Sequence, residues 1–214
     1  MSATDNSLSQ RQTSTKPQRA GTMGILVSEK GGKVLLLHRR EKTPEVPKNG
    51  NPDSWAFPGG GVDAGETPEQ AIVREFREEV GLDVKIVPFG NEFVLGQVDD
   101  VLEHGFWRCS FFVVKQTNPS QKPELKEPHK HVEFAWVDWN VMWGLIEGQI
   151  DFEAKNGTSK GMEGMRFFLS MVNMVKKYPG RSNVACLEYW PVGPSPFCCL
   201  LQLCLSKIPF LWWL

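Results

Sequence analysis

The sequence predicts a single domain that contains both strands and helices, and three observations lead to this prediction. The chain has 214 residues, which is enough for one domain of ordinary size with additional terminal segments. Short apolar runs bounded by glycine, proline and polar residues are typical of β-strands. Between two groups of these runs lies a segment with helical periodicity and recognisable start and stop signals.

The two ends of the chain differ in composition from its body. Residues 1–21 are rich in Ser, Thr and Gln, so we expect a disordered leader that is not a signal peptide. After Arg181 only two charged residues remain, and four of the five cysteines lie there. Residues 181–214 are therefore interpreted as an atypical apolar, cysteine-rich tail, and residues 22–180 as the catalytic domain.

The tail is not expected to cross a membrane. Gln202 and Lys207 interrupt its longest apolar run, and the tail also contains Pro194, Pro196 and Pro209. The alternative is a weak association of its last aromatic residues with a membrane surface. Because Cys109 is the one cysteine of the body, no disulfide can form there, which indicates a reducing compartment. We therefore expect a cytoplasmic protein, with the nucleus as the alternative compartment.

The elements of the body follow in order from the pattern of apolar residues. Candidate strands are residues 22–27, 33–38, 85–87, 92–98, 106–114 and 132–137, and candidate helices are residues 68–80, 138–146 and 162–177. The first two strands flank a Glu-Lys-Gly-Gly segment, which is typical of a hairpin or of adjacent strands. A polar, proline-containing loop, residues 40–53, leads into the glycines that precede the first helix.

The helix at residues 68–80 has the clearest boundaries. Thr67 is the predicted N-cap, Pro68 occupies the first helical position, and Gln70 completes a capping box. Gly81 supplies the C-terminal stop. The apolar stripe of this helix consists of Ile72, Val73, Phe76 and Val80.

Three carboxylates, those of Glu75, Glu78 and Glu79, lie together beside this stripe. Like charges at this spacing repel by roughly 0.2–0.5 kcal/mol per pair, so a positive partner is expected. One alternative is a solvated acidic face with Arg74 and Arg77 as partners. The other is a cation site, which the context favours. Oxygen ligands suit Mg²⁺ or Mn²⁺, and the preceding glycines, Gly59, Gly60 and Gly61, let backbone groups approach phosphates or metal.

The segment from Gly60 to Leu82 resembles the signature of the Nudix hydrolases. That signature is a glycine, five residues, a glutamate, seven residues, and then Arg-Glu-apolar-x-Glu-Glu-x-Gly-apolar. Every defined position is matched, by Gly60, Glu66, Arg74, Glu75, Phe76, Glu78, Glu79, Gly81 and Leu82. The resemblance implies an α/β/α sandwich with a mixed β-sheet between helices. It also implies an enzyme that hydrolyses a phosphoric anhydride bond in a nucleoside diphosphate derivative.

The resemblance further implies roles for individual residues of the signature. Glu78 and Glu79 are the expected principal ligands of Mg²⁺ or Mn²⁺, and Glu75 is a further ligand or a carboxylate that orients water. Arg74 is expected to orient this catalytic set. Glu66 and Gly81 are structural members of the signature, and the three glycines Gly59, Gly60 and Gly61 are expected to contact the substrate.

Residues outside the signature complete the predicted site. Family members often add a carboxylate from a later loop, and Glu127 or Glu133 could provide it; we favour Glu127, against the alternative of a solvated loop residue. Trp136 is the favoured aromatic residue for stacking on a base, against the alternative that it belongs to the core. Further stacking candidates are Trp55, Phe93 and Trp107. No role is assigned to the histidines His104, His129 and His131.

The net charge and the absence of residues typical of three subfamilies narrow the range of possible substrates. With 24 basic and 25 acidic residues the net charge is −1, so no polymeric nucleic acid is expected as a partner. The ADP-ribose subfamily has a proline well over ten residues after the signature, and the diadenosine polyphosphate subfamily has a tyrosine there. In this chain the nearest proline after Leu82 is Pro88 and the first tyrosine is Tyr178, so both subfamilies are disfavoured. The coenzyme A subfamily has an arginine and a glycine at the positions of Asn49 and Asp53, so it is also disfavoured.

The sequence most resembles the compact nucleoside triphosphate pyrophosphatases, which release a monophosphate and pyrophosphate. An ordinary or modified nucleoside triphosphate is therefore the leading prediction. The alternatives are a hydrolase of a non-nucleoside organic diphosphate and a non-catalytic module that senses nucleotides. The sequence leaves a homodimer open.

Overall fold

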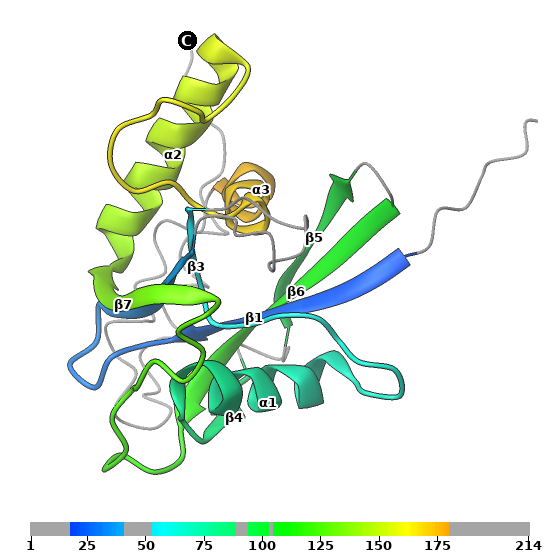
Figure 1. Ribbon diagram of the computed structural model, residues 1–214, viewed down its shortest axis with the longest axis vertical. Helices are drawn as coiled ribbons and strands as arrows, with labels where there is room; N and C mark the ends of the chain where they lie inside the picture. Colours follow the sequence, from blue (N-terminus) through cyan, green and yellow to red (C-terminus); the bar gives the residue numbers. More distant parts are fainter. Residues whose placement is uncertain (1–17, 41–52, 89–93, 103–104, 180–214) are drawn as a thin grey trace, which may run out of the picture.

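The computed structural model describes residues 18–40, 53–88, 94–102 and 105–179 (Figure 1). Its strands are β1 (Gln18–Leu26), β2 (Lys33–Arg39), β3 (Trp55–Ala56), β4 (Val84–Ile86), β5 (Val94–Leu102), β6 (Gly105–Gln116) and β7 (His131–Asp138), and its helices are α1 (Pro68–Val80), α2 (Trp139–Asn156) and α3 (Leu169–Lys177). Phe93, His104, residues 1–17 of the predicted leader and the tail lie outside the described residues.

The strands form a mixed sheet and a smaller antiparallel sheet. In the mixed sheet, β6 pairs in parallel with β1 and antiparallel with β4 and β5. In the second sheet, β2 lies between β3 and β7, with Leu35 opposite Trp136. The two strands β1 and β2 belong to different sheets and share the Val27–Val34 bridge, so they are adjacent strands rather than a regular hairpin.

Helices cover the strands on two sides. Figure 1 shows α1 on one side of the strands and α2 with α3 on the other. Successive side chains of a strand point to opposite faces, so the strands contribute to two apolar clusters. The cluster under α1 includes Leu35, Leu37, Ile72, Phe76 and Phe112, and the cluster beside α2 and α3 includes Leu36, Phe57, Phe111, Trp143 and Phe167.

The predicted caps of α1 are confirmed. Thr67 Oγ1 accepts a hydrogen bond from the Gln70 amide (3.3 Å), and Gln70 Oε1 accepts one from the Thr67 amide (2.9 Å). Gly81 adopts the left-handed conformation with φ 68°, which favours glycine. Ile72, Phe76 and Val80 are fully buried, as the apolar stripe predicts; they orient the helix so that its carboxylates lie beside the core.

Several elements differ from the sequence prediction: β3 was not expected as a strand, and β5 continues to Leu102, beyond the predicted residue 98. β1 begins at Gln18, before the expected start of the domain. Helix α2 continues to Asn156, because Gly148 faces open space and does not stop it, whereas Gly157 with φ 72° does. Helix α3 begins only at Leu169, because the preceding residues hydrogen-bond to Trp55: its amide donates to Arg166 O and its carbonyl accepts from the Phe168 amide. Among the described helices, none has the length and apolar character needed to span a membrane.

Candidate metal and catalytic site

The glycine loop before α1 lies directly against the carboxylates of that helix. The Gly59 amide donates a hydrogen bond of 2.8 Å to Glu79 Oε2. Gly59 has φ 151°, and a Cβ there would lie 2.1 Å from the carbonyl oxygen of Thr22. At Gly60, a Cβ would lie 2.5 Å from Glu75 Oε1. Glycine is therefore required at position 59 for the loop to pass this close to the backbone of β1, and glycine at position 60 leaves room for the Glu75 carboxylate.

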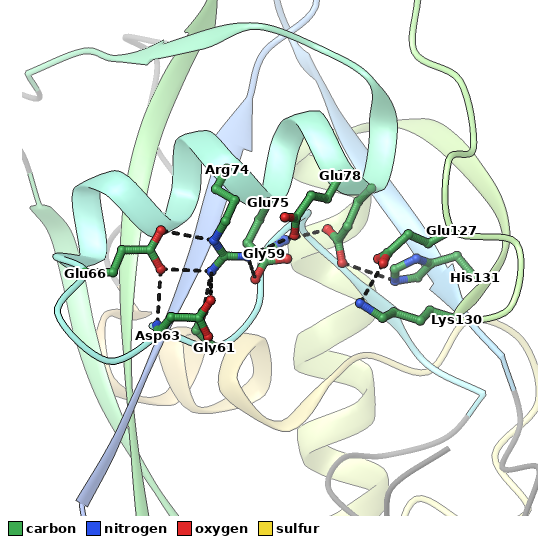
Figure 2. A network of polar contacts seen from close by, with 11 residues as sticks. Gly59, Gly61, Asp63, Glu66, Arg74, Glu75, Glu78, Glu127, Lys130 and His131 are labelled. Atoms are coloured by element: carbon green, nitrogen blue, oxygen red, sulfur yellow. Dashed lines mark hydrogen bonds and ion pairs between the residues drawn. The ribbon is translucent and has the colours of Figure 1, made fainter. Parts of the chain in front are cut away.

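Arg74 is the centre of a network of acidic residues on α1 and the loop before it (Figure 2). Its Nε and Nη2 atoms donate to the two carboxylate oxygens of Glu66 at 3.0 and 2.9 Å. Nη1 donates to Glu75 and Glu78, each at 2.9 Å, and Nη2 also donates to the Gly61 carbonyl at 2.9 Å. All five N–H donors of the guanidinium are therefore in use. These contacts, above all the one with Glu66, raise the pKa of Arg74.

The acidic face is only partly solvated. Glu75 and Glu79 are only 6% and 3% exposed, whereas the side chain of Glu78 is 47% exposed. Burial raises the pKa of Glu75, although Arg74 opposes this effect. Burial raises the pKa of Glu79 more strongly, and the neighbouring charge of Glu75 adds to the increase. Arg77, the other proposed local partner, instead contacts Asp83 at 2.7 Å.

A second acidic group forms at the C-terminal end of α1. One ligand atom from each of Glu79, Glu127 and His131 lies within 4.8 Å of the others. His131 Nε2 is 3.5 Å from Glu79 Oε1. Within the described part of the chain, the buried atoms Glu127 Oε2 and His131 Nδ1 have no hydrogen-bond partner. Burial, with Arg39 and Lys130 nearby, lowers the pKa of His131 to about 3, so its imidazole is neutral.

This group fits a divalent cation. The two carboxylates suit Mg²⁺ or Mn²⁺, and the neutral imidazole is a nitrogen ligand that favours a divalent transition metal such as Mn²⁺ over Mg²⁺. A buried carboxylate oxygen without a partner is unfavourable unless a cation or a donor approaches it. The unpaired Glu127 oxygen therefore supports the fit independently of the sequence signature.

The loop that carries Glu127 and His131 is attached to α1 by backbone hydrogen bonds. The Glu124 amide donates to Val80 O (3.0 Å), and the Lys126 amide donates to Glu79 O (2.9 Å). The amides of Lys130 and His131 both donate to Glu127 O, at 2.9 and 3.0 Å. This turn brings the side chains of residues 127 and 131 toward the same group, as Figure 2 shows.

Two cations beside this group were not singled out by the sequence analysis. Arg39 pairs with His131 in the β2–β7 register and lies over the ring of Phe168, with Cζ 4.9 Å from the centroid. Burial lowers the pKa of Arg39, against the opposing charges of Glu79 and Glu75. Lys130 Nζ is 2.8 Å from Glu127 Oε1. Although burial acts in the opposite direction, Glu127 raises the pKa of Lys130. Both cations are placed to attract phosphate.

The structure separates the remaining candidates from this group. The exposed Glu133 contacts His38 (Oε1 to Nδ1, 3.3 Å), so Glu127 is the later carboxylate that reaches Glu79. Trp136 lies opposite Leu35, several residues along β2 from Arg39. Of the other aromatic candidates, Trp55 stacks on His38 with ring centroids 4.7 Å apart, and Trp107 covers Gly21 and Gly61.

His131, Arg39 and Lys130 are residues of this group and its surroundings to which the sequence led us to assign no role. The Glu-x-x-x-His spacing of residues 127 and 131 is a signal that could have pointed to the histidine, since side chains four residues apart in a turn lie on one side. Arg39 has no such local signal, because only the pairing of β2 with β7 brings it to His131.

Comparisons with known proteins identify relatives of most of the described domain. A sequence model of the family described as NUDIX domain matches residues 18–155. The RNA pyrophosphohydrolase of Aeromonas hydrophila is 45% identical over 144 residues, which covers 61% of this chain and 75% of the relative.

Two solved structures are also similar. The MutT protein of Methanosarcina mazei Go1 is 22% identical with a TM-score of 0.52, covering 78% of this chain and 97% of that one. A MutT NUDIX hydrolase of Burkholderia pseudomallei is 26% identical with a TM-score of 0.45, covering 58% of this chain and 85% of that one. The predicted α/β fold, with a mixed sheet between helices, is confirmed.

Proposed function

Because the chain belongs to the NUDIX domain family, we propose that it is a metal-dependent pyrophosphohydrolase that cleaves a phosphoric anhydride bond of a nucleotide. The prediction of a Nudix hydrolase, made from the signature at Gly60 to Leu82, is confirmed at the level of the family. The observation that carries the proposed chemistry is the buried group of Glu79, Glu127 and His131 beside the signature helix.

The proposed metal ligands are the carboxylates of Glu79 and Glu127 with the imidazole of His131. A bound Mg²⁺ or Mn²⁺ supplies charge neutralisation for the diphosphate and activates the attacking water. Glu78, predicted as a principal ligand, and Glu75, predicted as a further ligand or a carboxylate that orients water, remain candidates. Because both accept hydrogen bonds from Arg74, either would have to exchange that partner to reach the cation.

The residues of the chain itself contribute positioning and charge. The Gly59 amide holds one oxygen of Glu79, which leaves the other directed toward His131. Arg39 and Lys130 provide positive charge for the phosphate oxygens, and Arg74 fixes the orientation of Glu75. Hydrolysis at phosphorus depends mainly on such positioning and on electrostatic stabilisation.

The leading substrate class is a free nucleoside triphosphate, ordinary or modified, converted to monophosphate and pyrophosphate. The name of the Aeromonas relative favours a second candidate, an RNA that carries a phosphoric anhydride group at its end. A module that only senses nucleotides is disfavoured because every carboxylate of the signature is present. A non-nucleoside organic diphosphate remains the third candidate.

The proposal is tested by assaying the purified full chain on nucleoside triphosphates, on a short RNA with a 5′-triphosphate and on an alkyl diphosphate. Each substrate is incubated with Mg²⁺, with Mn²⁺ or with EDTA, and products are separated by chromatography. We expect monophosphate and pyrophosphate from nucleoside triphosphates, and no product with EDTA. Faster turnover of the RNA would make it the preferred substrate. Absence of hydrolysis in all metal-containing reactions would refute the proposal.

A further inference from the structure

A second concave region lies away from the proposed metal centre. It is a groove of about 640 Å³, bounded by the turn between β1 and β2, the end of β6, the loop that follows β6, and one residue of β7. In Figure 1 this turn and this loop both lie at the lower left. The lining of the groove includes Val27, Lys30, Lys33, Lys115, Lys122 and Trp136.

The groove and the metal centre lie at opposite ends of β2. Lys33, the first residue of that strand, lines the groove, whereas Arg39, its last residue, pairs with His131. Between them, the side chains of Leu35 and Leu37 are packed in the buried apolar cluster under α1. No member of the Glu79, Glu127 and His131 group lines the groove. A ligand of nucleotide size in the groove therefore does not contact the proposed catalytic residues.

The groove is positively charged. Among the residues that the structure describes, its lining contains four lysines and one acidic residue, Glu29. The four lysines are all exposed, and none of them forms an ion pair with another described residue. Of the nearby carboxylates, Asp138 accepts the amides of Asn140 and Val141 at the start of α2, and Glu124 is paired with Lys126. The groove thus offers unpaired positive charge to an anion.

An indole ring lies beside these lysines. Trp136 is only partly buried, and it lines the groove together with the apolar side chains of Val27 and Val114. A large aromatic face next to several ammonium groups suits a ligand that joins a flat ring to a negative charge. The sequence analysis expected Trp136 to stack on a base, and the groove is where the structure makes that ring accessible.

The walls of the groove are held in place by hydrogen bonds. In the turn after β1, the Ser28 amide donates to Lys33 O (2.8 Å) and the Gly31 amide donates to Ser28 O (2.9 Å). In the loop after β6, Gln121 Nε2 donates to Asp83 Oδ2 (2.9 Å) and Gln116 Nε2 donates to Gln121 O (2.7 Å). Because both walls are already ordered, little conformational entropy is lost when a ligand binds.

We propose that this groove is a second binding site, for a nucleoside phosphate, with the base on Trp136 and the phosphate among the lysines. Small-molecule sites are typically about 300–1,000 Å³, so the groove has the size for one such unit. The unit can come from a free mononucleotide or from an RNA strand. The charge and the ring are the same in both cases, and the length of the bound molecule distinguishes them.

The site is tested by isothermal titration calorimetry on the full chain in EDTA, so that no divalent metal contributes to binding. The probes are AMP, inorganic phosphate and a five-nucleotide RNA with a 5′-monophosphate. The test variant combines Lys33→Gln with Lys115→Gln. Its matched control combines Lys155→Gln with Lys160→Gln, two exposed lysines on and after α2. A further variant, Trp136→Leu, is compared by thermal melting before its binding is interpreted.

We expect saturable binding of one AMP per chain, weakened at least about tenfold by the test variant, since two charge-assisted contacts are lost, and within twofold of wild type in the control. Phosphate should bind at least about fivefold more weakly than AMP, because it has no ring to stack. RNA binding tighter than AMP identifies the strand as the source, and equal affinity identifies the free nucleotide. Absence of AMP binding, or binding that the lysine variant does not weaken, would overturn the site. Equal affinities for phosphate and AMP would overturn its nucleoside specificity.

Discussion

The carboxylates in the middle of α1 and those at its C-terminal end have different partners. In the middle of the helix, Arg74 donates to Glu66, Glu75 and Glu78, so the negative charge is compensated by the protein. At the C-terminal end, Glu79 faces Glu127 and His131, and buried polar atoms in this group have no partner among the described residues. The difference indicates that the second group, although Lys130 pairs with Glu127, has the greater need of an external cation.

The two groups of carboxylates on α1 should therefore contribute differently to stability and to function. A buried, compensated network stabilises the folded chain or is neutral to it, whereas buried carboxylates without compensation destabilise it. The Arg74 network should therefore matter mainly for folding, and the Glu79 group mainly for metal binding and turnover. Substitutions in each of the two groups test this difference.

The largest effect is expected from Glu79→Gln. The amide preserves the size of the side chain and an oxygen for the Gly59 amide, but it removes a negative charge from the proposed metal centre. Because charge neutralisation and water activation both depend on that centre, turnover with Mg²⁺ should fall at least about a hundredfold. Burial raises the pKa of Glu79, so removing the charge should leave the melting temperature in EDTA unchanged or higher.

The matched control for this variant is Glu69→Gln, an exposed position in the first turn of the same helix. It should retain wild-type turnover within about twofold, because it lies at the other end of α1. Near-normal turnover of a folded Glu79→Gln protein would remove Glu79 from the catalytic site.

A smaller loss, about 10- to 100-fold in turnover, is expected from Glu127→Gln. The substitution removes the second proposed ligand and should also abolish the increase in melting temperature that Mn²⁺ gives the wild-type chain. Glu124→Gln, on the same loop but exposed and paired with Lys126, is the control and should keep both properties. A retained Mn²⁺ shift in Glu127→Gln would show that the cation binds elsewhere, for example at the predicted ligands Glu75 and Glu78.

The sequence predicted features that depend on neighbouring residues better than those that depend on the fold. The caps of α1 and its apolar stripe are local, so the pattern placed them correctly. The position of Glu127 relative to Glu79 depends on a long loop, and the sequence offered it only as one of two candidates. Arg39 could not be found, because the β2–β7 register alone places it. The start of α3 was also missed, since pairing with Trp55 replaces the first helical turns.

The next largest effect is a loss of stability, and it is expected from the Arg74 network in the middle of α1. Arg74→Ala should lower the free energy of unfolding by about 2–3 kcal/mol, because the buried Glu75 loses its charged partner. Urea unfolding monitored by tryptophan fluorescence measures this loss. Arg74→Lys should restore only part of it, since an ammonium group cannot make the two parallel contacts with Glu66. Equal stability of Arg74→Ala and wild type would show that the network is not a folding element.

The smallest effect should come from an exposed pair with the same bidentate geometry. Arg108 donates to Asp99 through Nε (2.7 Å) and Nη2 (2.9 Å), and both side chains are about half exposed. The hydrogen bond from Arg108 lowers the pKa of Asp99. The folded pKa is thus below the unfolded one, so the contribution of Asp99 to stability is present at neutral pH and is lost as the pH falls through the folded pKa. Asp99→Asn should lower the melting temperature at pH 7 by less than about 2 °C, because solvent screens the pair. The difference from wild type should disappear between about pH 5 and pH 2. If Asp99→Asn cost as much stability as Arg74→Ala, then bidentate geometry and not burial would set the strength of these pairs, and the distinction drawn between the two halves of α1 would lose its physical basis.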